Sequence, residues 1–350
     1  MSHNVVGIGP SLVDIGVSLS DEHYTECCTV LGVQPGDWTR IADADKFAAL
    51  TSVLTAEETP SGHFLNVLQD QHEATINAGS STLGMISAMS PEMRTHAAMV
   101  SALAENAGTP DPLSIFFRAA VQSVGSRHYG RVYTGHNPVG FVISSESTPE
   151  KVLANYPGVA NELEDYDVKA LQPELLILDA YELQVSKLGT FLDQLVQSGE
   201  FRIGLSLGNH SILTGELRDR IRQYIAGHKI NVLCGNDTEY RALYPELEKG
   251  LATAAGFRSH PVLSDVPFAV MTFGEQGMVA QWDGNKIVST PADTVEVYHI
   301  KNTSGAGDTT AGVIYEGILS GSEADETLRK AARMAAKVLQ TYSSRIVAES

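Results

Sequence analysis

The chain has 350 residues, with 24 Lys and Arg against 42 Asp and Glu, and a formal net charge of −18. This balance argues against broad binding to nucleic acids or to anionic membranes, because no basic stripe is present to release counterions. The length and a hydrophobic fraction of 43% predict a globular protein with a large core. We expect either about two domains or one α/β domain with an insertion.

Cysteine usage and the absence of long apolar runs bear on the compartment. The cysteines Cys27, Cys28 and Cys234 are odd in number and two are adjacent, so no disulfide framework or zinc spacing is readable. No apolar run approaches the roughly 18 residues of a membrane helix. The N-terminal residues lack the basic and apolar regions of a signal peptide. We therefore expect reduced thiols in a cytoplasmic protein.

The first half of the chain mixes short strands with small-residue turns. Val5 to Ile8 predicts a strand that is closed by Gly9-Pro10, and a strand-like run over 13–17 follows. Asp14 lies among apolar residues in that run, so it is either a turn or edge residue or a substrate contact. The polar stretch 20–38 is an excursion from the core. Further on, helices are predicted over 42–54, 83–89 and 111–124, and strands over 97–103, 132–135 and 139–144.

Two short polar stretches in this half have open interpretations. Ala78-Gly79-Ser80-Ser81-Thr82 is a small-residue turn before a helix, and it either marks close packing or lets the hydroxyls of a ligand reach the backbone. His136 stands beside Asn137 without a partner at metal-ligand spacing, which favours a loop residue over a metal ligand.

The second half alternates more cleanly between short apolar strands and helices. Strands are predicted over 175–178, 202–207, 230–233 and 267–272, with a hairpin around 283–285 and a strand-like segment over 294–300. Helices are predicted over 185–197, 215–226, 309–320 and 323–342. This alternation is typical of an α/β fold with a doubly wound, mostly parallel sheet covered by helices on both faces.

Three turns that follow second-half strands carry chemistry: 236–239, 272–277 and 303–308. Turns after parallel strands gather at one edge of the sheet, so we expect these turns to lie together. Each has a plainer interpretation alone, since 236–239 fits a helix capping box and 272–277 fits an ordinary turn. No P-loop, His-Glu-x-x-His or Gly-x-Ser-x-Gly sequence competes with them.

The last of these turns predicts an anion site with a base. Gly305, Ala306 and Gly307 let backbone N–H groups approach a ligand closely at the start of a helix, where unpaired N–H groups favour negative charge. Asp308 would repel a bound phosphate. That conflict disappears if the anion is a phosphoryl group in transit and Asp308 accepts the proton of the attacking hydroxyl.

The segment Asn302-Thr303-Ser304-Gly305-Ala306-Gly307-Asp308 resembles the C-terminal signature of the ribokinase-like (PfkB) carbohydrate kinases, Asp-Thr-x-Gly-Ala-Gly-Asp. Four other stretches, in family order, are similar to the opening strand with its substrate Asp, the Gly-Gly turn, the Asn-x-x-Glu motif and the Thr-x-Gly-x-x-Gly turn: 9–15, 78–80, 236–239 and 272–277. The layout of 133–160 and of 331–342 resembles the adenosine-kinase-like branch.

The resemblance implies ATP- and Mg²⁺-dependent phosphorylation of a primary hydroxyl on a sugar or nucleoside. Asp308 would be the general base, and the N–H groups of Gly305, Ala306 and Gly307 the anion hole. The substrate would meet Asp14, Gly79 and Ser80. ATP would be bordered by Asn236, Thr272, Gly274, Gly277 and Thr303, and Glu239 would organise Mg²⁺ through water.

The resemblance also implies the architecture. One ribokinase-like domain would span 1–350, with a small discontinuous β lid from about 16–40 and 128–160 that closes the site and offers a surface for a homodimer. Four positions depart from the family pattern, Ala78, Leu83, Asn302 and Thr310, and the basic residue of the lid near 148–151 is also off pattern. They affect the predicted substrate-binding residues more than the residues of phosphoryl transfer. They leave open an alternative function, a regulatory protein that binds a sugar or nucleotide but has lost catalytic activity.

Overall fold

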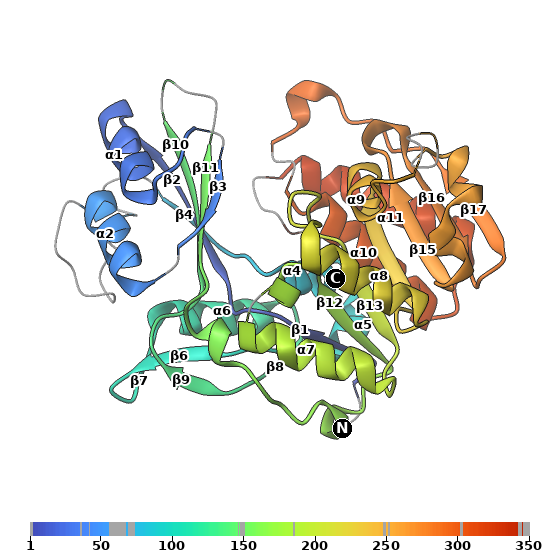
Figure 1. Ribbon diagram of the computed structural model, residues 1–350, viewed down its shortest axis with the longest axis horizontal. Coiled ribbons are helices and arrows are strands. Elements are labelled where there is room, and N and C mark those ends of the chain that lie inside the picture. The colour runs from blue at the N-terminus through green and yellow to red at the C-terminus, as the bar shows by residue number, and fades with distance from the viewer. Residues whose placement is uncertain are drawn as a thin grey trace.

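The computed structural model describes residues 3–35, 37–41, 43–55, 68, 74–145, 147, 151–184, 186–247, 250, 253–301, 304–341 and 345. Within them, the main body is built on a nine-stranded sheet (Figure 1). Its order is β17 (Lys286–Thr290), β16 (Met278–Trp282), β15 (Phe268–Thr272), β14 (Val232–Asn236), β13 (Ile203–Ser206), β12 (Leu175–Asp179), β1 (Val5–Ile8), β5 (Ala97–Val100) and β8 (Arg127–Tyr129). The strands from β15 to β8 are parallel, and β16 and β17 are antiparallel.

Successive residues of the strands face two separate cores, which makes three layers. Val5 belongs to one buried cluster and Val6 to the other, as the two-residue period of a strand requires. The first face is covered by α4 (Ser81–Ser87), α5 (Pro91–Thr95), α6 (Pro112–Ser123), α10 (Ala306–Leu319) and α11 (Ala324–Leu339). The second is covered by α7 (Ser186–Ser198), α8 (Gly215–Ala226) and α9 (Asp237–Leu243). The expected three-layer, mostly parallel α/β fold is confirmed.

A second, smaller sheet stands beside the main body (Figure 1). Its order is β3 (Trp38–Arg40), β11 (Val152–Tyr156), β10 (Val139–Ser145), β2 (Val13–Leu19) and β4 (Thr75–Ala78). Two helices, α1 (Asp21–Leu31) and α2 (Ala44–Thr55), pack on one face and bury residues such as Cys27 and Phe47 against it. We call this sheet the lid sheet, and its other face lines the cavity described below.

Short elements complete the fold. A small third sheet has the order β7 (Thr109–Pro110), β6 (Leu103–Asn106) and β9 (Val132–Thr134). The 3-10 helices are η1 (Gly158–Glu162), η2 (Val168–Leu171), η3 (Glu182–Gln184), η5 (Gly256–Ser259), η6 (Pro261–Ser264), η7 (Gly274–Gln276) and η8 (Val297–His299).

Three expectations differ from this structure. The lid sheet does not share the bounds 16–40 and 128–160: β4 lies outside both ranges, and β8 pairs in the main sheet instead. The polar stretch 20–38 contains helix α1, which Ser20 caps through its side chain. The strand-like prediction for 294–300 is wrong, because only Val297–His299 form a regular element, the 3-10 helix η8, with Val297 82% and Tyr298 72% exposed. None of the described strands pairs with this segment.

Candidate active site

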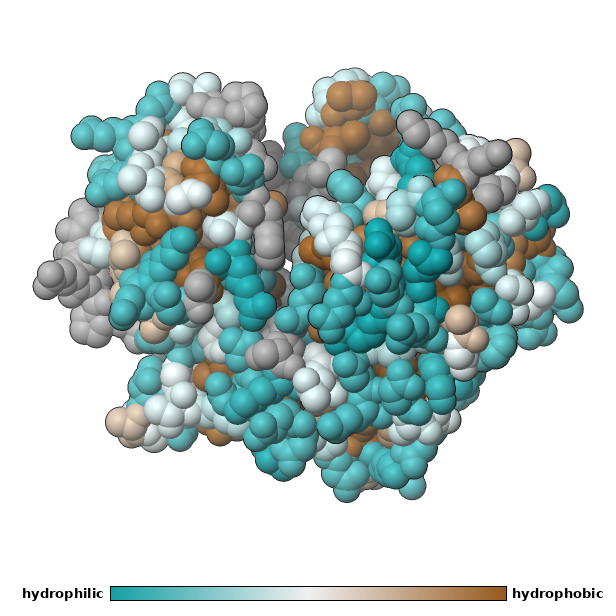
Figure 2. Space-filling model, in the orientation of Figure 1, coloured by the Kyte–Doolittle hydropathy of each residue, from teal (hydrophilic) through white to brown (hydrophobic). Residues whose placement is uncertain are grey.

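The carboxyl ends of the parallel strands open into a cavity of about 590 Å³ between the main body and the lid sheet. Figure 2 shows the surface hollowed between these two parts. A smaller cavity of about 70 Å³ adjoins it at the ends of β13, β14 and β15. Ligands of α/β sheets gather at this edge, because the turns that follow parallel strands meet there.

Asp308 lies in the first turn of α10 and lines both cavities. Gly305 precedes the helix at φ 84°, a left-handed conformation that favours glycine. The next N–H groups, those of Ala306, Gly307 and Asp308, have no partner within the helix because of their position in its first turn. The structure thus brings the predicted base and the predicted anion hole together at a helix N-terminus, where negative charge is favoured.

Several carboxyl groups surround Asp308. Burial raises the pKa of Asp308 well above its ordinary value, the neighbouring carboxylates of Asp179, Glu239 and Asp14 raise it further, and a hydrogen bond from Ser81 opposes them. Burial also raises the pKa of Asp179 to about 7. A carboxylate with a raised pKa is a stronger base, which suits a group that accepts a proton near neutral pH.

Asp14 lies on the cavity face of β2, where it alternates with the buried residues Val13 and Ile15. Glycines on both sides make room for its carboxylate: a Cβ on Gly79 would lie 2.6 Å from Asp14 Oδ2, and one on Gly140 would lie 2.4 Å from Oδ1. Burial raises the pKa of Asp14 to about 6, while the Arg345 guanidinium lowers it. An ionised carboxylate has about four lone-pair sites, so its oxygens can accept hydrogen bonds from substrate hydroxyls.

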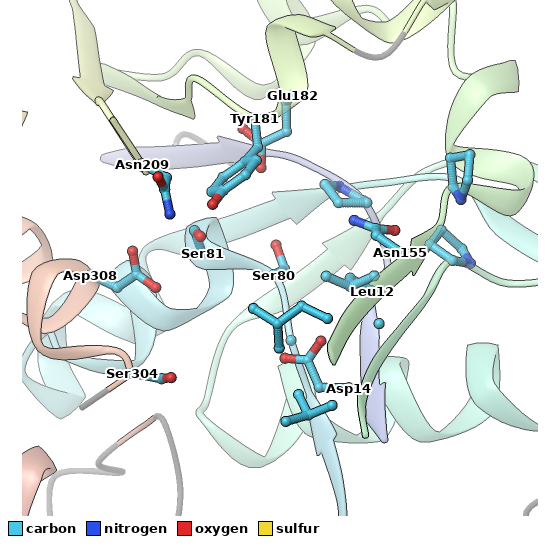
Figure 3. A pocket seen from close by; sticks show the side chains of 18 of the residues that line it. Leu12, Asp14, Ser80, Ser81, Asn155, Tyr181, Glu182, Asn209, Ser304 and Asp308 are labelled. Atoms are coloured by element: carbon cyan, nitrogen blue, oxygen red, sulfur yellow. The ribbon is translucent and has the colours of Figure 1, made fainter. Parts of the chain in front are cut away.

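Hydroxyl groups lie between these two acids. Figure 3 shows Ser81 beside Asp308, and Ser80 between Ser81 and Asp14. Ser80 is 1% exposed, lines the large cavity, and its Oγ has no hydrogen-bond partner among the described residues. A buried hydroxyl without a partner is costly, and a substrate hydroxyl at this point would satisfy it.

Asn236 and Glu239 form the capping box of α9. Asn236 Oδ1 accepts from the backbone N–H of Glu239 (2.9 Å), and Glu239 Oε2 accepts from the backbone N–H of Asn236 (2.8 Å). Both residues also line both cavities. The capping role and the predicted binding role are therefore compatible, because each carboxylate oxygen retains a lone pair.

The remaining predicted nucleotide contacts are placed differently. Thr272 ends β15 and lines the small cavity, whereas Gly274 and Gly277 line neither cavity. Gly277 has a local structural reason to be glycine, since φ is 95° and a Cβ would lie 2.1 Å from Thr290 O. Thr303, like Asn302, lies outside the described residues.

Sequence reasoning missed a second acidic turn. Glu182 and Tyr181 follow β12 directly and line the large cavity, next to the buried Asp179. Glu182 Oε1 accepts from Thr82 Oγ1 (3.0 Å), and Oε2 accepts from the backbone N–H of Asp179 (2.6 Å). The rule that selects the other post-strand turns could have found this one, because Leu175 to Leu178 is a predicted strand.

Of the four departures from the family pattern, Ala78, Leu83 and Thr310 lie in the described residues, and none of these three lines the large cavity. Ala78 and Leu83 are fully buried in the core, and Thr310 lines only the small cavity while its Oγ1 donates to Ala306 O (2.9 Å). These three residues therefore contribute no group to the lining of the large cavity.

Across the described part of the chain, no three His, Cys, Asp or Glu side chains are grouped to hold a metal ion. In that same part, no helix is both long and apolar enough to cross a membrane.

Comparison with known proteins identifies the family. Residues 115–350 match the model of the pfkB family carbohydrate kinases. No curated protein matches by sequence. The fold resembles adenosine kinase from Sinorhizobium meliloti (TM-score 0.73, 17% identity, covering 99% of this chain and 97% of that one). It also resembles a probable sugar kinase from Rhizobium etli CFN 42 (0.74, 16%, 99% and 96%) and Schistosoma mansoni adenosine kinase bound to 2-fluoroadenosine (0.72, 15%, 99% and 98%). The expected family is confirmed, and the chain belongs to the pfkB family of carbohydrate kinases.

Proposed function

We propose that this chain transfers the γ-phosphoryl group of ATP, with Mg²⁺, to a primary hydroxyl of a sugar or nucleoside. One observation carries the proposal: Asp308 stands beside the unpaired N–H groups at the start of α10, in the same cavity as Asp14. Asp308 would accept the hydroxyl proton as that oxygen attacks the phosphoryl group. The helix N-terminus would stabilise the charge on the transferring group.

The arrangement suits Mg²⁺ held through water. Both oxygens of Glu239 are already engaged by Asn236, one by its backbone N–H and one by its side-chain Nδ2 (2.8 Å each). The remaining lone pairs can accept from metal-bound water, and Mg²⁺ usually keeps several waters. Mg²⁺ would neutralise phosphate charge next to an acidic protein wall.

The lid sheet would exclude water from the reaction. Leu12, Phe141 and Leu153 line the large cavity from this sheet or from the segment just before it. Exposed ATP would otherwise lose its phosphoryl group to water, so closing an apolar cover over the site protects it. The adenosine and 2-fluoroadenosine named for similar structures make nucleosides natural members of a substrate panel.

The test is ATP turnover on a panel of sugars and nucleosides, comparing the wild type with Asp308→Asn. We expect ATP-dependent phosphorylation of at least one panel member and a loss of ~10²–10⁴-fold in the variant, the usual worth of a general base. Asp219→Asn, which removes an exposed carboxylate on α8, is the matched control. Nucleotide binding without turnover on any member would favour a regulatory binding protein instead.

A further inference from the structure

The charges that line the large cavity are unequal. Its acidic side chains are Asp14, Glu182, Glu239 and Asp308. Among the described lining residues, Arg40 is the one cationic side chain, and it comes from β3 at the edge of the lid sheet. A cation at the rim of an acidic cavity needs a reason, because the chain carries a net charge of −18 and has many acids with which to pair it.

Arg40 is not paired with an acid. Its Nη2 donates to the neutral Oδ1 of Asn161 at 3.1 Å. No described carboxylate lies within 4.0 Å of its guanidinium, whereas Arg131, Arg220 and Arg222 each form an ion pair. A guanidinium has five N–H donors in a planar fork, so Arg40 retains donors for a ligand.

Asn155 accompanies Arg40. The two residues are register partners on the parallel strands β3 and β11, and Ile41 N donates to Asn155 O at 2.8 Å. Both side chains line the cavity. A guanidinium beside a carboxamide offers several N–H donors from one side, which matches the oxygens of a carboxylate or phosphate.

This pair lies far from the reacting end. Figure 3 shows Asn155 and Asp308 on opposite sides of the cavity, with Leu12 beside Asn155. The volume of about 590 Å³ is in the range of sites for drug-sized ligands. A substrate with its hydroxyl at Asp308 can therefore extend past the apolar wall to Arg40.

We infer that the substrate carries an anionic group, a carboxylate or a phosphate, at the end remote from the phosphorylated hydroxyl, and that Arg40 and Asn155 bind it. This inference rests on the proposed function. Closing the lid would withdraw the exposed Arg40 from water, and a buried cation is costly without an opposite charge. A neutral substrate would leave that cost uncompensated.

The test uses pairs of acceptors that differ in one acidic group: uridine against orotidine, its carboxylate derivative, and fructose against fructose 1-phosphate. We expect the wild type to favour the acidic member of at least one pair in kcat/KM. Arg40→Ala should lower kcat/KM for that member by ~10–100-fold and leave the neutral member within about threefold, as charge-assisted hydrogen bonds predict. For the acidic member, Arg40→Lys should give a kcat/KM between those of the wild type and Arg40→Ala. Arg131→Ala, a surface control, should behave as the wild type.

Calorimetric binding of the same pairs without ATP separates this inference from the proposed function. Asp308→Asn should bind the acidic member as tightly as the wild type, and Arg40→Ala should bind it ~10–100-fold more weakly. Arg40-dependent binding without turnover would uphold the anion site and overturn the kinase proposal. Asp308-dependent turnover with no acidic preference in either pair, or equal losses on both members in Arg40→Ala, would overturn the anion site alone. The pair that responds shows whether the group is a carboxylate or a phosphate.

Discussion

Asp308 is tuned by its neighbours, and this leads to a pH prediction. The Asp179 carboxylate is the first neighbouring charge that raises the pKa of Asp308. Asp179→Asn removes this charge and retains an oxygen to accept from the backbone N–H of Tyr181. The pKa of Asp308 should fall, so the acid limb of the kcat/KM profile should move to lower pH. Asp165→Asn, which removes an exposed carboxylate, is the control and should leave the pH profile unchanged. If the acid limb also stays in place in Asp179→Asn, the Asp179 carboxylate does not influence the catalytic base.

Asp14 links function to stability through its pKa of about 6, against 3.8 for a free side chain. The folded state binds this proton more tightly than the unfolded state, so ionisation costs stability as pH rises from about 4 to about 6. Asp14→Asn should therefore stabilise the fold at pH 8, by roughly 1–3 kcal/mol, and by less below pH 4. Urea unfolding of the wild type and Asp14→Asn at both pH values measures this difference in stability. We also expect the variant to bind the acceptor substrate more weakly. A variant that is less stable at pH 8 would contradict this account of Asp14.

Individual site residues could be predicted from the sequence where a recognisable motif falls in a turn. Asp308, Asp14 and Ser80 were predicted from short stretches, and all of them line the large cavity. Arg40 and Asn155 could not be predicted, because they meet only through the pairing of β3 with β11, across more than a hundred residues.

Among the elements, strands β2 and β10 hold Asp14 in place by close approach. Gly140 is the register partner of Asp14, and a Cβ there would lie 2.4 Å from Asp14 Oδ1. Gly140→Ala should displace the carboxylate and raise the KM for the acceptor by at least ~10-fold, the worth of one good hydrogen bond to a charged group. The KM for ATP should change little. Steady-state kinetics with each substrate varied in turn measures both, and equal changes in the two constants would point to general unfolding instead.

The chain crosses from the main body to the lid sheet at Asn137, which is fully buried. Its Nδ2 donates to Ser11 O (2.5 Å) and Pro138 O (3.2 Å), and its Oδ1 accepts from Ser114 Oγ (2.8 Å). It thus ties the two segments that lead into β2 and β10 to helix α6. Asn137→Ala removes the side-chain donor to the buried Ser11 carbonyl, whereas Pro138 O still accepts from the backbone N–H of Val13 (3.2 Å). The variant should destabilise the protein by about 2–3 kcal/mol in urea unfolding, against about 1 kcal/mol for Ser114→Ala. If the two variants lose the same free energy of unfolding, the hydrogen bonds of Asn137 at this crossing contribute no more to stability than that of Ser114.

The elements were predictable in proportion to their periodicity. The apolar strands β12 to β15 and the helices α8, α10 and α11 agree with the sequence patterns. Helix α1 was missed because its polar face and the breakers after it hid four buried residues, Tyr24, Cys27, Cys28 and Leu31. The segment 294–300 had β-branched residues but no neighbour to pair with among the described strands, and propensity without pairing does not make a strand.

In the whole molecule, the two faces of the lid sheet have different surroundings. Helices α1 and α2 cover one face (Figure 1). The other face lines the cavity. The expected homodimer through the lid remains a prediction, and the edge strands β3 and β4 are the parts of the sheet left to pair with a second copy.

The order of motifs along the chain predicted the main body well, since local turns at strand ends define it. The lid depends on strand pairings distant in sequence, which local patterns do not encode.

We propose that Asp308 acts in phosphoryl transfer rather than in binding. A single-turnover, rapid-quench measurement with both substrates saturating tests it most directly, because it reports the chemical step alone. We predict that Asp308→Asn slows phosphoryl transfer by ~10²–10⁴-fold while the Kd for ATP stays within about threefold of the wild type. Equal transfer rates in the two proteins would contradict the account.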